Sequence, residues 1–319
     1  MDFQLKLWVI RYDPVEDGQS LSEKYISYLF GGKTAKEYID LLTNQQIEAF
    51  KTATNGLVNF NYSKYTHLDT FPTYPSLTPY TFETYDKCQS RTDLAYCDAR
   101  KYAFDYVKWL ESNKICEQIA ANDIDEVWIY GMPYIMTWEA FVISGKPAPF
   151  ITNGAVYQSD TCKKTIHFVN PMLDRPDMTL HNFGHRFEVG LIHMKNELGS
   201  EAAGYLYNDF IVACGDTHVP FNTAIQYDVA NQTVAVGNCL DWKNIPSLKG
   251  EKITGNCTLW GCNDFGWQAF RFSFYPRSSD LMDAKSKTRK VIRVSKNFWY
   301  YLLYPDFMIN EVERWKYNE

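Results

Sequence analysis

The chain has 319 residues, of which 45% are hydrophobic and 22% charged, and its formal net charge is −6. This composition is typical of a folded globular protein, and the acidic balance disfavours nucleic acid as a partner because phosphate binding needs a dense basic surface. We predict one α/β domain over residues 1–319. Its core spans residues 1–204, and an aromatic, loop-rich portion over residues 205–319 covers that core.

Four segments in the first part of the chain have clear patterns. Leu5–Tyr12 runs apolar and predicts a buried strand, and Thr34–Thr52 has the apolar spacing of one or two helices. Leu57–Tyr62 alternates apolar and polar residues, which predicts a half-buried strand. Ser63–Tyr85 is read as a long irregular stretch, and a loop of that length is usually functional, so we expect it to form a wall of the site.

The middle of the chain continues this alternation of helices and strands. Asp93–Ala121 is the strongest helical segment, and it leads into the short apolar strand Val127–Tyr130. Two further strands are predicted at Pro149–Ile151 and Thr165–Val169. A helix, a short link and a buried strand in succession indicate an α/β fold with a mostly parallel sheet flanked by helices. The last third, with clustered turn residues, predicts short strands and loops.

The stretch Met178–Leu198 predicts a long helix, and its segment Leu180–Leu191 carries two of the six histidines of the chain. His181, His185 and Glu188 stand at positions i, i+4 and i+7, which fall on one helical face. Two imidazoles and a carboxylate on one face are a candidate divalent-metal site, or an acid/base cluster if no metal binds. Gly184 between the histidines suggests that another backbone or a ligand approaches the helix there.

A helical His-x3-His pair is the geometry that zinc peptidases use, with a third ligand from downstream in the chain. His218, in a loop bounded by glycine and proline, is the candidate third metal ligand. The pattern departs from that of zinc peptidases because Asn182 follows the first histidine, where those enzymes have a glutamate base. We therefore predict that Glu188 is the fourth ligand or the base. Glu139, downstream of the strand that ends near Gly131, is the alternative base.

Three other interpretations of the same residues remain open. His185, Arg186 and Glu188 could form a buried polar network that fixes the helix against the sheet. Glu139 and Glu188 could be the carboxylate pair of a metal-free glycoside hydrolase, with aromatic residues lining a sugar cleft. The chain could also bind carbohydrate or peptide without catalysis.

No apolar segment is long enough for a membrane span, and no signal peptide precedes the first strand. These observations fit a cytoplasmic protein or a secreted mature form that has lost its leader. The eight cysteines do not decide between the two. Cys88 with Cys97, and Cys257 with Cys262, have the spacing of short disulfide loops, but buried free thiols are equally compatible.

Several motifs resemble those of an uncharacterised microbial protein family whose members are often secreted. The motif H-x-F-G-H-R-x-E begins at His181, the motif H-x-P-x-N begins at His218, and an upstream block ends at Glu139. The resemblance supports these residues as site positions, favours a secreted mature form, and implies no activity. We predict a metal-dependent hydrolase that uses zinc or another divalent cation, with peptides as the first choice of substrate and carbohydrates as the second.

Overall fold

A computed structural model of the protein describes most of the chain. The described residues are 2–71, 80–92, 105–133, 139–146, 152–173, 178–198, 214–239, 252–275, 277–285, 291–307 and 310. Contacts between residues divide the chain into two compact units. The first unit comprises residues 1–48, 58–146 and 157–179, and the second comprises residues 49–57, 147–156 and 180–319. The predicted single domain, with a covering portion from residue 205, stays a prediction.

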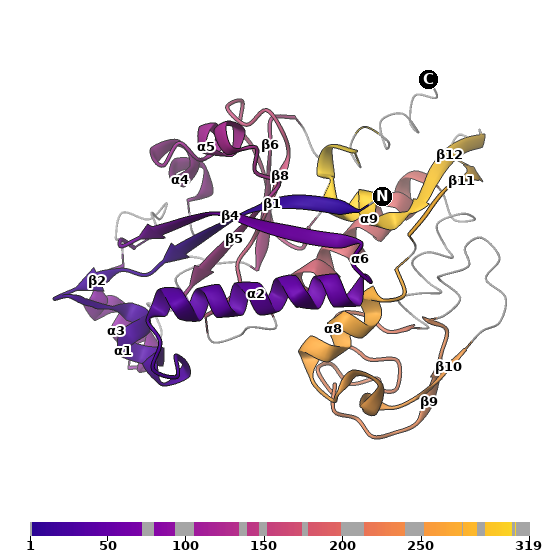
Figure 1. Ribbon diagram of the computed structural model, residues 1–319, viewed down its shortest axis with the longest axis horizontal. Helices are drawn as coiled ribbons and strands as arrows, with labels where there is room; N and C mark the ends of the chain where they lie inside the picture. The colour runs from indigo at the N-terminus through magenta and orange to yellow at the C-terminus, as the bar shows by residue number, and fades with distance from the viewer. Residues whose placement is uncertain are drawn as a thin grey trace. The chain divides into compact units, whose positions relative to one another are not determined.

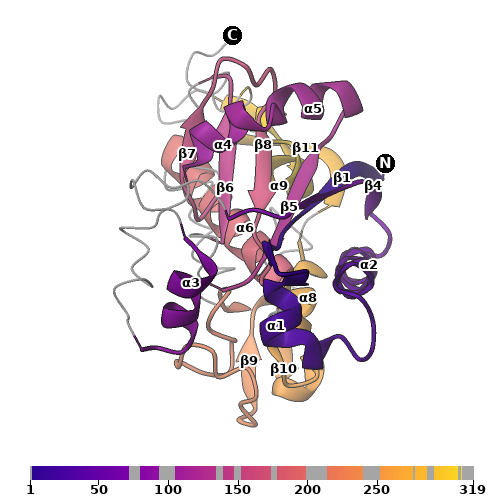
Figure 2. The same cartoon turned by 90° about the vertical axis from the view of Figure 1, so that its left-hand side faces the viewer.

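The first unit is built on a six-stranded sheet with the order β4-β1-β5-β8-β6-β7. The strands are β1 (Phe3–Tyr12), β4 (Val58–Leu68), β5 (Glu126–Gly131), β6 (Ala140–Ser144), β7 (Val156–Gln158) and β8 (Ile166–Val169). Four neighbouring strands, from β4 to β8 in that order, pair in parallel, and β6 pairs with β8 in the antiparallel direction. Figure 2 shows β5, β8 and β6 side by side. The predicted mostly parallel α/β sheet is therefore confirmed.

The central strand β1 is buried on both faces. Leu7, Trp8, Val9 and Ile10 are each 0% exposed. A parallel strand covered by helices on both faces needs a continuous apolar run rather than alternation, which is the pattern that predicts this strand. In Figure 1, α2 (Ala35–Ala53) lies on one side of β1 and β4, and α4 (Tyr106–Ser112) and α5 (Ile115–Asn122) lie on the other.

The remaining elements of the first unit are short. They are β2 (Val15–Glu16), β3 (Gln19–Ser20), α1 (Leu21–Ile26), the 3-10 helix η1 (Ser27–Leu29), α3 (Phe82–Gln89), α4 (Tyr106–Ser112) and α5 (Ile115–Asn122). On the covering helices, the Thr43 hydroxyl of α2 donates to the Tyr130 hydroxyl of β5 at 3.2 Å. Trp109 of α4 packs edge-on against Phe168 of β8, with ring centroids 5.8 Å apart. Both faces of the sheet are thus covered by helices, as the sequence predicts.

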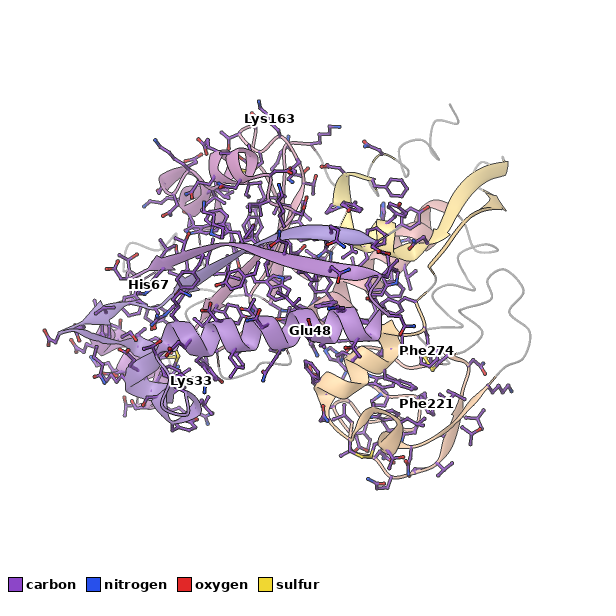
Figure 3. All side chains as sticks on the ribbon, in the orientation of Figure 1. Lys33, Glu48, His67, Lys163, Phe221 and Phe274 are labelled. Carbon is purple, nitrogen blue, oxygen red and sulfur yellow. A yellow bond between two sulfur atoms is a disulfide. The ribbon has the colours of Figure 1, made fainter. Side chains whose placement is uncertain are left out.

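The interpretation of Ser63–Tyr85 as one irregular stretch is wrong at both of its ends. β4 continues to Leu68 because its pairing with β1 resumes after a register shift at Ser63, and α3 begins at Phe82 behind a capping box made by Thr81. His67 therefore lies on a strand rather than in a loop, and Figure 3 labels it there. Its Nε2 lies 3.0 Å from the Asp13 carbonyl. Residues 72–79 lie outside the described part of the chain.

A strand of the sheet is missing from the predictions, and two predicted segments lie outside the described residues. Strand β6 was not predicted, because a five-residue apolar run is too short for its period to be read. The predicted strand Pro149–Ile151 and the first part of the predicted helix, residues 93–104, lie outside the described residues.

The second unit contains α6 (Met178–Leu198), which has the predicted bounds, and a series of short elements after it. These are β9 (Ala235–Gly237), β10 (Ile253–Gly255), the 3-10 helix η5 (Cys257–Trp260), α8 (Asp264–Phe272), β11 (Arg277–Lys285), β12 (Val291–Asn297) and α9 (Phe298–Leu303). The predicted loop-rich portion with short strands is confirmed. Helix α8 was not predicted, and it carries residues of the candidate site.

A compact aromatic cluster supports this unit around α8. Trp260 and Trp267 are buried with Cys257, and Phe221 and Phe270 pack against them. Figure 3 labels Phe221 beside α8. Because these rings are in contact with one another and largely buried, they act as a core rather than as an open aromatic cleft.

Disulfides are present in both units. Cys116 pairs with Cys162 in the first unit, and Cys214 with Cys239 and Cys257 with Cys262 in the second. Of the two alternatives that the sequence leaves open for Cys257 and Cys262, the structure has the short disulfide loop. Cys88 is also disulfide-bonded, and its predicted partner Cys97 lies outside the described residues.

Candidate metal centre

His181 and His185 converge on one face of α6, as their spacing predicts. Their Nε2 atoms lie 3.1 Å apart, and their rings meet edge to face with centroids at 4.7 Å. His181 is 1% exposed and His185 is 8% exposed. The two imidazoles therefore meet in a buried environment, where an unsatisfied polar atom is costly.

His218 joins this pair from the loop between Cys214 and Cys239. Its ring centroid lies 5.1 Å from that of His181 and 4.6 Å from that of His185. One potential ligand atom from each of the three residues lies within 4.8 Å of the others. Burial, together with the nearby His185 and His181, lowers the pKa of His218, so its ring stays neutral with a lone pair available.

His181 and His185 each have a carboxylate at the second ring nitrogen. Nδ1 of His181 lies 3.4 Å from Asp264 Oδ2, and Nδ1 of His185 lies 3.4 Å from Glu188 Oε2. A carboxylate at Nδ1 favours the tautomer that carries its proton there. Both Nε2 atoms then present lone pairs toward each other.

Glu188 is held by several donors at once. The backbone N–H and the hydroxyl of Thr217 donate to its Oε1 at 2.6 and 2.7 Å, and Arg271 Nη2 lies 2.8 Å from the same oxygen. Burial alone would raise the pKa of Glu188, but Arg271, His185 and Thr217 outweigh it and lower the pKa to about 2. A carboxylate this acidic is a poor proton acceptor at neutral pH, so its contacts favour a positioning role.

Helix α8 faces this side of α6 and supplies partners for its residues. Asp264, Gln268 and Arg271 stand at i, i+4 and i+7, the same spacing as His181, His185 and Glu188 on α6. The two faces meet in register, because Asp264 lies at His181 and Arg271 at Glu188. The sequence does contain a start signal for α8, since the Asn263 side chain caps the helix and Asp264 lies in its first turn.

Gly184 allows this close approach. A Cβ at Gly184 would lie 2.6 Å from Thr217 Oγ1, 2.9 Å from Gln268 Oε1 and 3.2 Å from Arg271 Nη1. The sequence predicts a backbone or a ligand at this glycine, and the structure instead has three side chains of the second unit there. Two of them, Thr217 and Arg271, are donors to Glu188.

The loop that carries His218 is braced by α8 and by its own turn. Trp267 Nε1 donates to the Asp216 carbonyl at 3.0 Å, and Gln268 Nε2 donates to the Thr217 carbonyl at 2.8 Å. The Asp216 carboxylate accepts the backbone N–H of His218 at 2.7 Å. Gly215 has φ +91°, a backbone conformation that favours glycine. These contacts place His218 beside α6 without a bond to its ring.

The other predicted residues are placed as follows. Glu139 belongs to the first unit, directly before β6, where its backbone carbonyl accepts the N–H of Asn170 at 2.8 Å. Its catalytic role, like that of Glu188, stays a prediction. Arg186 lies over the ring of Phe183, with Cζ 4.8 Å from the centroid. Sequence reasoning missed Asp264, Thr217 and Arg271, because no local pattern pairs them with α6.

Comparison with known proteins adds no assignment. No family model and no curated protein matches the chain. Among solved structures, a chain described as "Structure of a chaperone-substrate complex" matches with a TM-score of 0.30 and 9% identity. The match covers 58% of this chain and 24% of that chain, and a TM-score this low carries no argument about fold or function.

Proposed function

We propose that His181, His185 and His218 bind one divalent cation, with zinc as the first choice, and that the protein is a metal-dependent hydrolase. The observation that carries the proposal is the pair of Nε2 atoms 3.1 Å apart, each on a ring whose Nδ1 faces a carboxylate. With both protons on Nδ1, two lone pairs oppose each other in a buried place. A cation between them removes that repulsion.

The spacing supports zinc in particular. Two nitrogen ligands at about 2.0–2.1 Å from a tetrahedral zinc ion lie roughly 3.3 Å apart, close to the separation of the two Nε2 atoms. His218 completes a three-histidine set, and its atom lies within 4.8 Å of the other two. His218 would be the third ligand of the ion. Asp264 and Glu188 have the place of the outer carboxylates that orient metal-binding histidines.

Zinc held by three histidines supplies acidified water and Lewis-acid polarisation of a carbonyl, which is the chemistry of hydrolysis. Asp264 and Glu188 hold the two histidine rings in position, and Arg271 compensates the buried charge of Glu188. Peptides are the proposed substrates, with carbohydrates as the second choice.

The contacts disfavour a metal-free glycoside hydrolase. That mechanism needs one carboxyl group with a raised pKa as the acid. The pKa of Glu188 is instead lowered to about 2, and the aromatic cluster around Trp260 and Trp267 is packed as a core.

We also propose that the protein acts in an oxidising compartment such as the cell exterior. Three disulfides among the described residues support this, since such bonds persist in secreted proteins and are rare in the cytosol. Among the helices that the structure describes, none has both the length and the apolar character to span a bilayer.

The test is the zinc content of the purified protein after dialysis against zinc, measured by elemental analysis. The expected result is one zinc per chain in the unmodified protein. In His181→Ala and His185→Ala the zinc affinity should fall by more than the 10- to 100-fold that follows loss of an outer-shell partner. His193→Ala, on the same helix, is the matched control and keeps its zinc. If His185→Ala retains a full equivalent of zinc, the proposed centre is wrong.

Hydrolysis is tested separately with a set of quenched fluorescent peptides. The zinc-loaded protein should cleave some of them, and His185→Ala, which removes a zinc ligand, should lose this cleavage. Peptide cleavage that survives the loss of zinc would contradict the proposed mechanism.

A further inference from the structure

Tyr227 is the large exposed side chain beside the histidines. Its ring is stacked on that of His181, with an interplanar angle of 10° and centroids 6.2 Å apart, and it is tilted against His218 at 4.8 Å. The residue is nevertheless 54% exposed. An exposed aromatic ring that also touches two buried or half-buried candidate ligands is well placed to contact whatever reaches the metal.

The backbone holds Tyr227 in this place in a strained conformation. Its φ is +61°, in the left-handed region that non-glycine residues rarely adopt, and its N–H donates to the His218 carbonyl at 2.7 Å. Such a conformation costs about 1–2 kcal/mol and persists where surrounding structure enforces it, often at ligand sites. The turn therefore fixes the ring next to His218 and leaves part of it open to solvent.

The surroundings of Tyr227 are apolar and mildly acidic. Between Cys214 and Cys239 the chain has two charged residues, Asp216 and Asp228, and no lysine or arginine. Ile225, two residues before Tyr227, is 66% exposed. This segment thus offers no cation to a phosphate or a carboxylate, whereas it offers apolar surface to an uncharged side chain.

We infer that Tyr227 is the specificity-determining residue of the proposed metal centre and binds an aromatic or branched apolar side chain of a peptide next to the scissile bond. This inference rests on the proposed function, since it places the substrate at the metal. Contact between two aromatic rings is worth about 0.5–1.5 kcal/mol beyond the burial of apolar area, so one such contact measurably changes affinity.

The experiment compares two metal-chelating ligands that differ by one aromatic side chain. Acetohydroxamate and N-acetyl-phenylalanine hydroxamate are titrated into the zinc-loaded protein by calorimetry, which needs no catalysis. The expected ratio of their Kd values is about 10- to 100-fold in favour of the aromatic ligand. Tyr227→Ala should reduce that ratio by about 10-fold, and Tyr227→Phe should preserve it because the ring remains.

Tyr28→Ala is the matched control, since Tyr28 is 77% exposed in the first unit, and it should leave the ratio as in the unmodified protein. If zinc binds and Tyr227→Ala leaves the ratio unchanged, the inference about Tyr227 is overturned while the metal centre stands. If Tyr227→Ala or Tyr227→Phe loses zinc, the residue supports the metal rather than the substrate, which also overturns the inference. If the unmodified protein binds no zinc, the proposed function itself fails.

Discussion

Each unit of the molecule contains a buried pair of arginine and carboxylate, and the two pairs are built differently. In the first unit, Arg11 Nε donates to Asp13 Oδ2 at 2.8 Å, and the N–H of Ser22 donates to Asp13 Oδ1 at 2.8 Å. In the second, Arg271 Nη2 lies 2.8 Å from Glu188 Oε1, and the two residues are 83 positions apart. One pair fixes a turn within a few residues, whereas the other joins two helices.

The two pairs differ in how far the loss of one of them should affect the rest of the molecule. In the local pair, Arg11 lies near the end of β1 and Asp13 lies directly after it, and the pair closes a turn whose residues are neighbours in the chain. The distant pair holds α6, α8 and the loop of Thr217 together at the histidines. A buried charge whose partner comes from another segment depends on the whole tertiary arrangement. We therefore expect damage at Glu188 and Arg271 to reach the metal centre, and damage at Arg11 to remain in the turn.

The largest expected effect is that of Arg271→Met. It leaves the buried carboxylate of Glu188 without its ion partner, which costs about 3–5 kcal/mol of the free energy of unfolding. Arg11→Met should also destabilise the protein. Urea unfolding gives both losses, and zinc titration of the folded proteins separates them, since only Arg271→Met should weaken zinc binding. Equal zinc affinity in the two variants would remove the distinction between the pairs.

Loss of one disulfide in each unit gives the second comparison. Replacing both Cys214 and Cys239 by serine, or both Cys116 and Cys162, should cost about 3–4 kcal/mol in either case, because the closed loops have similar chain-entropy terms. The first double variant should also lose zinc affinity, because that loop carries His218. Thermal unfolding and zinc titration check this. A zinc affinity that falls in both variants would mean that stability alone controls binding.

The two glycines of α6 provide a sharper comparison within one helix. Gly184→Ala should cost about 1–3 kcal/mol, because its Cβ collides with Thr217 and Gln268. Gly190→Ala meets nothing within 4 Å and should gain up to about 1 kcal/mol through better helix propensity. Unfolding in urea measures both changes. A neutral Gly184→Ala would show that the contact with α8 is looser than the distances indicate.

The smallest expected effect is that of Asp264→Asn. Its carboxylate lies 3.4 Å from His181 Nδ1, and replacing it should weaken zinc binding by about 10-fold, the lower end of the range for outer-shell partners. Asp123→Asn, at an exposed salt bridge of the first unit, is the control. Competition with a chromophoric chelator measures both affinities. If Asp264→Asn leaves the zinc affinity unchanged, a residue other than Asp264 orients the His181 ring.

The fold was largely predictable because burial leaves a local pattern. β1, β5 and β8 are apolar runs, and α6 has the bounds that its spacing predicts. The failures are equally local. β4 was cut short at Tyr62, and α8 was hidden by aromatic residues on several faces, which blur a helical stripe. The sequence signal that marks the start of α8 is the side-chain cap made by Asn263.

The candidate site was predictable only on the helix that carries the histidine pair. His181, His185 and Glu188 are related by helical spacing, so the sequence suffices to bring them together. Asp264 and Arg271 come from more than 80 positions away, and no rule of spacing selects them from the other acids and arginines of the chain. Tertiary packing at Gly184 brings Asp264 and Arg271 to the site. The sequence marks Gly184 only as a position of close approach.

The place of β1 in the sheet also has a consequence for how the chain folds as it is made. Both neighbours of β1 are synthesised later, and Lys6 bonds to Asp125, 119 residues further on. At about 5–20 residues per second, β1 waits roughly 6–24 s for its second neighbour. During that time its apolar run exposes unpaired backbone groups, which invites association with other nascent chains. Yield of the protein on expression should therefore depend on the crowding of nascent chains and on chaperones, independently of the stability of the finished fold.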